Sequence, residues 1–154
     1  MNWLTDLLTN PFLITSTSSW FIAQAIKVII NLCITKKLSI ERMFGDGGMP
    51  SGHSATVSSL AIFTALRCGC SSFEFAVTAI LAIIVCHDAM GVRQETGKQA
   101  MVINDMVEQF EKLLKQDIVD IDLKELVGHT PLQVLAGITL GVCNAFAMHY
   151  WVFG

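Results

Sequence analysis

Four apolar stretches alternate with polar segments along the chain. The first runs from about Pro11 to Thr35 and is broken only by Lys27, and the second covers roughly His53 to Leu66 and is rich in Ser, Thr and Ala. The third runs from Phe75 to Met90, and the fourth, Pro131 to Gly154, contains no Asp, Glu, Lys or Arg. A helix that crosses a bilayer needs about 20 mostly apolar residues, with about 17 as the lower limit. The first and fourth stretches reach this length easily, whereas the second and third are short.

Two polar loops, Lys36 to Met49 and Gly91 to Thr130, separate these stretches on one side. In the second loop, apolar residues recur at helical spacing with charges between them, which predicts an amphipathic helix at the membrane interface or packed over the bundle. These residues are Met101, Val102, Met106, Phe110, Leu113 and Leu114. We therefore expect an all-α fold in which residues 1–154 form one integral membrane bundle of about four transmembrane helices.

The composition supports a membrane protein over a soluble one. The apolar fraction is 53% and the charged fraction 15%, whereas a soluble domain carries about 25% charged residues. Four apolar helices could also form a globular core, but the chain has too little polar surface to cover it. The net charge of −3 and the lack of a Lys/Arg-rich stripe exclude nucleic acid as an expected partner.

The distribution of basic residues predicts the orientation. The two polar loops share a side and hold eight Lys or Arg, whereas the opposite side holds Arg67 alone. The eight are Lys36, Lys37, Arg42, Arg93, Lys98, Lys112, Lys115 and Lys124. Because loops rich in Lys and Arg stay in the cytoplasm, we expect both loops to be cytoplasmic and both termini to lie outside.

Two histidine motifs carry the candidate chemistry. Pro50 and Ser51 are typical of a helix start, so Gly52 and His53 should lie in the first turn, where free N–H groups attract an anion. In the second motif, Thr130 and Pro131 should start the fourth helix and leave His129 just outside its N-terminus. Such a pair of histidines suits phosphoryl transfer, since one can attack phosphorus while the other protonates the leaving oxygen.

These motifs resemble a known superfamily. Pro50 to His53 matches the P-S-G-H motif of the type 2 phosphatidic acid phosphatases and vanadium haloperoxidases, and His129 to Gly137 is similar to their final motif, H-x-P-x-D-V-L-A-G. The chain as a whole looks like the small divergent branch of that superfamily. Asp88-Ala89-Met90-Gly91-Val92-Arg93 is a further mark of the branch, and the resemblance spans about Ala23 to Gly141.

The resemblance implies a role for each residue that matches a motif. His129 would attack phosphorus and become phosphohistidine, and His53 would protonate the leaving alkoxide and later activate water. Ser51, the Gly52 amide, Arg93, and Lys27 or Arg42 would hold the phosphate. No metal or other cofactor is implied, because fixed positive groups neutralise the phosphate instead.

Three departures leave alternatives open. Leu123 stands where an arginine precedes the nucleophile by six residues, so Arg93 fits only if residues 94–122 are an insertion. Lys36 and Arg42 are one residue too close for the first motif. Gln133 replaces the Asp that orients the nucleophilic histidine, and Asp88 is the candidate substitute, with a structural ion pair to Arg93 or Lys98 as its alternative. Lys27 either binds phosphate or extends along the membrane to water.

The leading functional interpretation is a metal-independent phosphatase acting on a lipid or prenyl phosphate, with a bacterial plasma membrane as the location that the resemblance suggests. The alternative is a weakly active or non-catalytic membrane protein that binds a lipid phosphate, which Gln133 motivates. A haloperoxidase is a third and poorer fit to so small a chain. Gly137 and Gly141 form a small-residue helix face that suits packing within the chain or a homo-oligomer.

Overall fold

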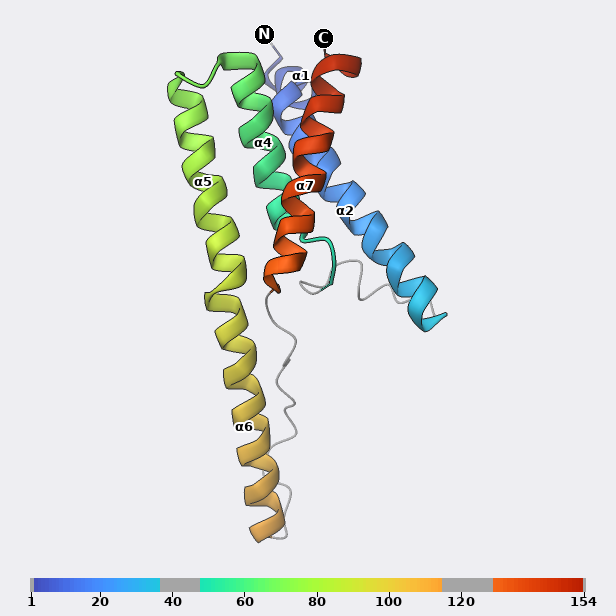
Figure 1. Ribbon diagram of the computed structural model, residues 1–154, viewed down its shortest axis with the longest axis vertical. Helices are drawn as coiled ribbons and strands as arrows, with labels where there is room; N and C mark the ends of the chain where they lie inside the picture. The colour runs from blue at the N-terminus through green and yellow to red at the C-terminus, as the bar shows by residue number, and fades with distance from the viewer. Residues whose placement is uncertain (1, 37–47, 115–128, 154) are drawn as a thin grey trace.

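The computed structural model describes residues 2–36, 48–114 and 129–153, and the regular structure within these ranges is entirely helical. The elements are α1 (Trp3–Leu8), α2 (Pro11–Thr35), α4 (Gly52–Cys68), α5 (Phe73–Met90), α6 (Val92–Leu114), α7 (Pro131–Ala147) and the π-helical turn η1 (Met148–Val152) (Figure 1). The all-α prediction is confirmed, and each expected apolar stretch corresponds to a helix.

Polar side chains at the helix starts explain the boundaries. Asn10 caps α2 by accepting hydrogen bonds from the backbone N–H groups of Phe12 and Leu13. Ser51, Ser72 and Thr130 cap α4, α5 and α7 in the same way, and α2 and α7 each have Pro as their first residue. These caps satisfy N–H groups that have no carbonyl partner in the first turn. Both histidine motifs therefore start helices, as the sequence predicted.

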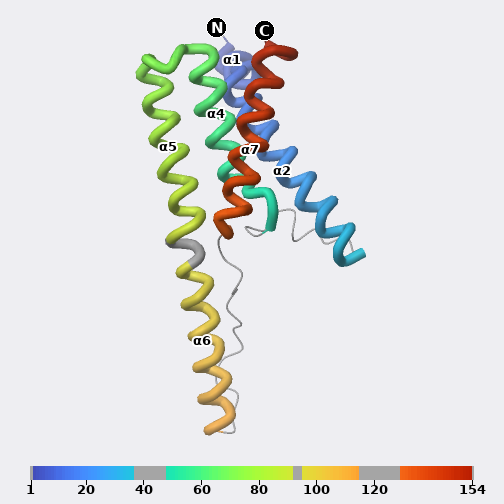
Figure 2. Tube along the Cα trace, in the orientation of Figure 1, coloured from blue at the N-terminus to red at the C-terminus, as the bar shows by residue number. Residues whose placement is uncertain are grey.

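Helix α4 lies at the centre of the bundle and packs against α2, α5 and α7. The N- and C-termini lie together at one end. Toward the opposite end, α4 and α7 begin and α5 ends, while the last turns of α2 diverge from the other helices (Figures 1 and 2). Gly137 and Gly141 of α7 face α4, where an added Cβ would lie only 2.4 Å from the carbonyl oxygens of Ser51 and Ala55 respectively. This small-residue face is thus occupied within a single chain.

The bundle has a polar interior and an apolar surface. Thr15, Ser19, Ser54 and Ser59 are buried, whereas large apolar side chains of α2, α5, α6 and α7 are exposed, Ile84 at 59% for example. Such a distribution is stable when lipid covers the apolar surface. Within the described residues, three helical segments are long and apolar enough to cross a membrane: Pro11–Thr35, Phe73–Leu114 (α5 running on into α6) and Pro131–Val152. Helix α4, with 17 residues, runs beside them.

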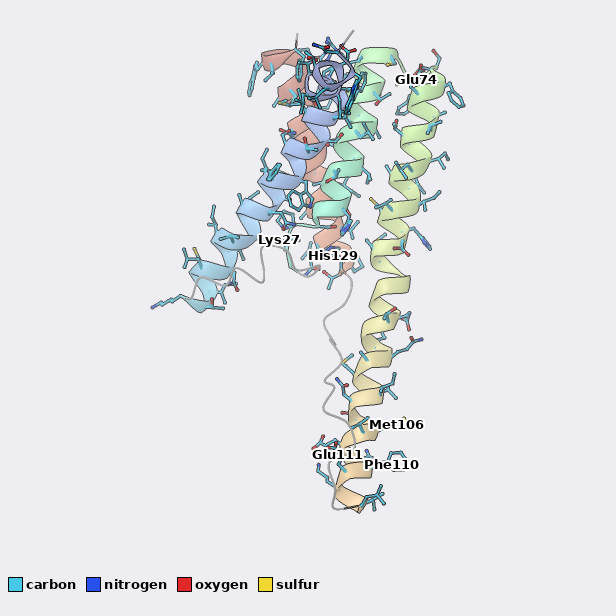
Figure 3. The ribbon with its side chains drawn as sticks, turned by 180° about the vertical axis from the view of Figure 1, so that it is seen from behind. Lys27, Glu74, Met106, Phe110, Glu111 and His129 are labelled. Atoms are coloured by element: carbon cyan, nitrogen blue, oxygen red, sulfur yellow. The ribbon has the colours of Figure 1, made fainter. Side chains whose placement is uncertain are left out.

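Helix α6 confirms the predicted amphipathic helix but not its packing over the bundle. It continues the course of α5 away from the other helices (Figures 1 and 2). Only Gly91 separates the two helices, and one residue is too short a link for the chain to turn back. Met106 and Phe110, which belong to its apolar positions, lie far from the bundle (Figure 3) and are half-exposed.

Candidate active site

His53 lies in the first turn of α4, on the solvent-accessible side of a tightly closed turn. The Ser51 hydroxyl accepts hydrogen bonds from the backbone N–H of Ser54, 3.3 Å away, and from its hydroxyl, 3.0 Å away. Ser51 and Gly52 are buried, whereas His53 is exposed. The N–H groups of Gly52 and His53 precede the first intrahelical bond of α4, so they remain suited to an anion. The predicted contact of Ser51 with phosphate stays a prediction.

His129 is anchored on two sides just before α7 begins. Its backbone N–H donates to the carbonyl oxygen of Ala89, near the end of α5, over 3.1 Å. Thr130 follows as the N-cap of α7, with its hydroxyl accepting from the backbone N–H of Gln133. The residue is only 2% exposed. His129 therefore has a fixed backbone and a ring enclosed by the protein.

The side chain of Gln133 contacts the His129 ring. Its Oε1 lies 3.2 Å from Nδ1 of His129 and accepts a hydrogen bond from the backbone N–H of Thr130 over 3.1 Å. The second bond completes a capping box with Thr130. Gln133 thus lies beside the histidine ring, at the position where the superfamily motif has an orienting Asp.

The two histidines lie close together because the first turns of α4 and α7 pack against each other. The backbone N–H of Ser51 donates to the carbonyl oxygen of Gln133 over 3.0 Å, and Gly137 contacts Ser51 one turn further along α7. The ring centroids of His53 and His129 are 6.3 Å apart, with the rings inclined by 55°. The two rings are therefore close enough to contact the same bound phosphate group.

Helix α2 packs against both α4 and α7 and brings two buried polar side chains near the start of α4. Lys27 and Gln24, one turn apart on its inner face, are 7% and 8% exposed, and Lys27 and His129 both lie at the end of the bundle where α4 and α7 begin (Figure 3). The stem of Lys27 lies beside Gly48, and Trp20 and Gln24 lie beside Gly52. Lys27 is therefore buried at the start of α4, and its binding of phosphate stays a prediction.

The remaining predicted residues are only partly described. Asp88 is half-buried in the last turn of α5, adjacent to Ala89, which bonds His129. Arg93 belongs to the first turn of α6, but its side chain lies outside the described part of the structure. Arg42 and Leu123 fall outside the described residues altogether. The roles assigned to Asp88, Arg93 and Arg42 stay predictions.

Comparisons with known proteins agree with this arrangement. The model of the divergent PAP2 family matches residues 8–144. The chain belongs to the divergent PAP2 family. It is also 39% identical to the uncharacterized membrane protein YuiD of Bacillus subtilis (strain 168), over 95% of this chain and 98% of that protein. No solved structure matches the chain. Its divergent PAP2 family membership and its membrane-spanning helices together make it a membrane protein.

Sequence reasoning missed Gln24 and the cap that holds Gln133 in this divergent PAP2 site. The pattern Thr130-x-x-Gln133 is a capping-box signature, which fixes the Gln133 side chain at the start of α7. Gln24 lies three residues before Lys27, so helical periodicity puts both on one face. Neither signal required knowledge of the tertiary structure.

Proposed function

We propose that this protein is a membrane-embedded phosphatase that hydrolyses a lipid or prenyl phosphate monoester or diphosphate through a phosphohistidine intermediate. The observation that carries the proposal is the pairing of His53 and His129 across 6.3 Å at two adjoining helix N-termini. A buried histidine with an anchored backbone suits the nucleophile, and an exposed one suits proton exchange. Membership of the divergent PAP2 family supports the same reaction class.

In the proposed reaction, His129 acts as the nucleophile and His53 acts first as an acid and then as a base. Nε2 of His129 forms a bond to phosphorus while the bond from phosphorus to the leaving oxygen breaks, and protonated His53 gives its proton to that oxygen. Water then attacks the phosphorus, His53 accepts a proton from the water, and the P–N bond breaks. Inorganic phosphate leaves, and both histidines return to their starting states.

The positive end of α4 and the Lys27 side chain would hold the phosphate. Free N–H groups of the first turn and the helix dipole favour negative charge, and a fixed ammonium stabilises the charge of the transition state. We propose that Ser51, Gly52, Arg42 and Arg93 complete this set and that Asp88 acts beside His129. Because the bundle exposes an apolar surface, a substrate whose tail lies in the bilayer is the class that reaches such a site. We further propose that the site faces the cytoplasm across a plasma membrane.

Phosphate release tests the proposal directly. Purified protein in lipid nanodiscs would be given phosphatidic acid, phosphatidylglycerophosphate and undecaprenyl phosphates, with His129→Ala and His53→Ala as paired variants. We expect release from at least one lipid and none with His129→Ala. Tight lipid-phosphate binding without turnover by the wild type would instead support the binding-protein alternative, and turnover by His129→Ala would refute the mechanism.

A further inference from the structure

We infer that Gln133 is the positioning residue that holds the His129 ring in a single tautomer without giving it a charged partner; the inference rests on the proposed function. The oxygen of its side-chain amide is identified by the backbone N–H of Thr130, which can only donate and lies 3.1 Å away. The same Oε1 lies 3.2 Å from Nδ1 of His129. An oxygen acceptor there requires Nδ1 to carry the hydrogen, which places the lone pair of the ring on Nε2, the atom proposed to attack phosphorus.

The capping box makes this arrangement rigid. The Thr130 hydroxyl accepts from the backbone N–H of Gln133 while Gln133 accepts from the backbone N–H of Thr130, so the glutamine side chain is held from both ends of one turn. Its backbone carbonyl also accepts from Ser51. Gln133 therefore links the nucleophile, the start of α7 and the turn that carries His53, and it has little freedom to release the His129 ring.

A neutral partner sets the charge state of the nucleophile differently from a carboxylate. Only the neutral imidazole can attack, and a carboxylate at this distance would stabilise the imidazolium and raise the pKa of His129. Among the described residues, the other charged or titratable groups at this end of the bundle are His53 on α4, His87 and Asp88 at the end of α5, and Lys27 on α2. These groups are the same whichever side chain stands at position 133. A glutamine thus orients the ring while leaving the nucleophile neutral at a lower pH than a glutamate would.

The test uses three variants that separate the effects of charge, of the oxygen acceptor and of the helix cap. Gln133→Glu keeps an oxygen acceptor for both Thr130 and His129 and adds only charge. Gln133→Leu removes the acceptor, and Thr130→Val removes the other half of the capping box while leaving the contact between Gln133 and His129. The readouts are the ¹⁵N NMR signals of the His129 ring, assigned by their loss in His129→Ala, and the pH dependence of kcat/KM.

We expect the wild type and Thr130→Val to show hydrogen on Nδ1, whereas Gln133→Leu shows a mixture of tautomers and a fall in kcat of about 10²-fold. Gln133→Glu should keep hydrogen on Nδ1 and shift the acidic limb of kcat/KM upward by about one pH unit or more. An unchanged tautomer in Gln133→Leu, or an unmoved acidic limb in Gln133→Glu, would overturn the inference. If no substrate is hydrolysed but the NMR result holds, the proposed function fails while the positioning of the ring stands.

Discussion

Replacing Gly137 with Ala should separate the two histidines without removing any group from the site. The new Cβ would lie 2.4 Å from the carbonyl oxygen of Ser51 and 3.0 Å from Cβ of Ser54, whereas ordinary contact begins at 3.4 Å. The first turn of α4 must therefore move by about 1 Å relative to α7, and a misplacement of about 1 Å in a catalytic arrangement can cost about 10²-fold in rate. We expect kcat for phosphate release to fall by about that factor.

Gly141→Ala is the matched control. Its Cβ would lie at the same 2.4 Å from a carbonyl oxygen of α4, that of Ala55, but one turn further from the histidines. Both variants should lose about 1–3 kcal/mol of stability through overpacking, offset by the better helix propensity of Ala. We expect equal falls in thermal stability but a clearly smaller loss of kcat for Gly141→Ala. Equal losses of kcat, or wild-type kcat in Gly137→Ala, would refute the link between this contact and the site geometry.

Three further predictions test other parts of the proposal. His53→Ala should lower kcat by about 10²–10⁴-fold, the usual contribution of a general acid–base group, and a change of less than threefold would remove it from the mechanism. Orthovanadate should inhibit phosphate release, because it mimics five-coordinate phosphorus, whereas EDTA should have no effect; loss in EDTA that magnesium restores would reveal a metal requirement. On a Cys-free background, single cysteines at Ser39 and Gln116 should resist a membrane-impermeant thiol reagent in intact cells. Labelling of both would reverse the orientation, and labelling of one would contradict the four-span topology.

Hydrophobic patterning and helix-start chemistry were enough to locate the four apolar helices. The stretch expected from Phe75 to Met90 forms α5, which starts two residues earlier at Phe73 because Ser72 provides the cap. The sequence Thr130-Pro131 correctly predicted that α7 starts at Pro131. These features are local, since an apolar run and a capping side chain act within a few residues of one another. The two histidine positions followed from the same local signals.

The packing partners of each helix and the direction of α6 could not be predicted from these local signals. Helix α6 was expected at the interface or over the bundle. Because Gly91 is the only residue between α5 and α6, the link is too short for α6 to fold back over the bundle. The inward orientation of Lys27 depends on which face of α2 packs against α4, and a single sequence does not show which face that is. Whether Gln133 or Asp88 contacts Nδ1 of His129 likewise depended on the side-chain positions of two different helices.

The short second stretch shows how packing resolves an ambiguous sequence. Eight of the 17 residues of α4 are buried, against two of 18 in α5, so the Ser-rich helix is enclosed by neighbours that carry the apolar surface. Its hydroxyls bond mainly to carbonyls of its own preceding turn, as Thr64 does to Leu60 over 2.8 Å, which removes most of the cost of placing them inside the bundle. Small side chains and glycines then allow the close approach of α4 to α7. The small, hydroxyl-rich side chains of this short stretch are therefore the property that lets it carry His53 to within 6.3 Å of His129.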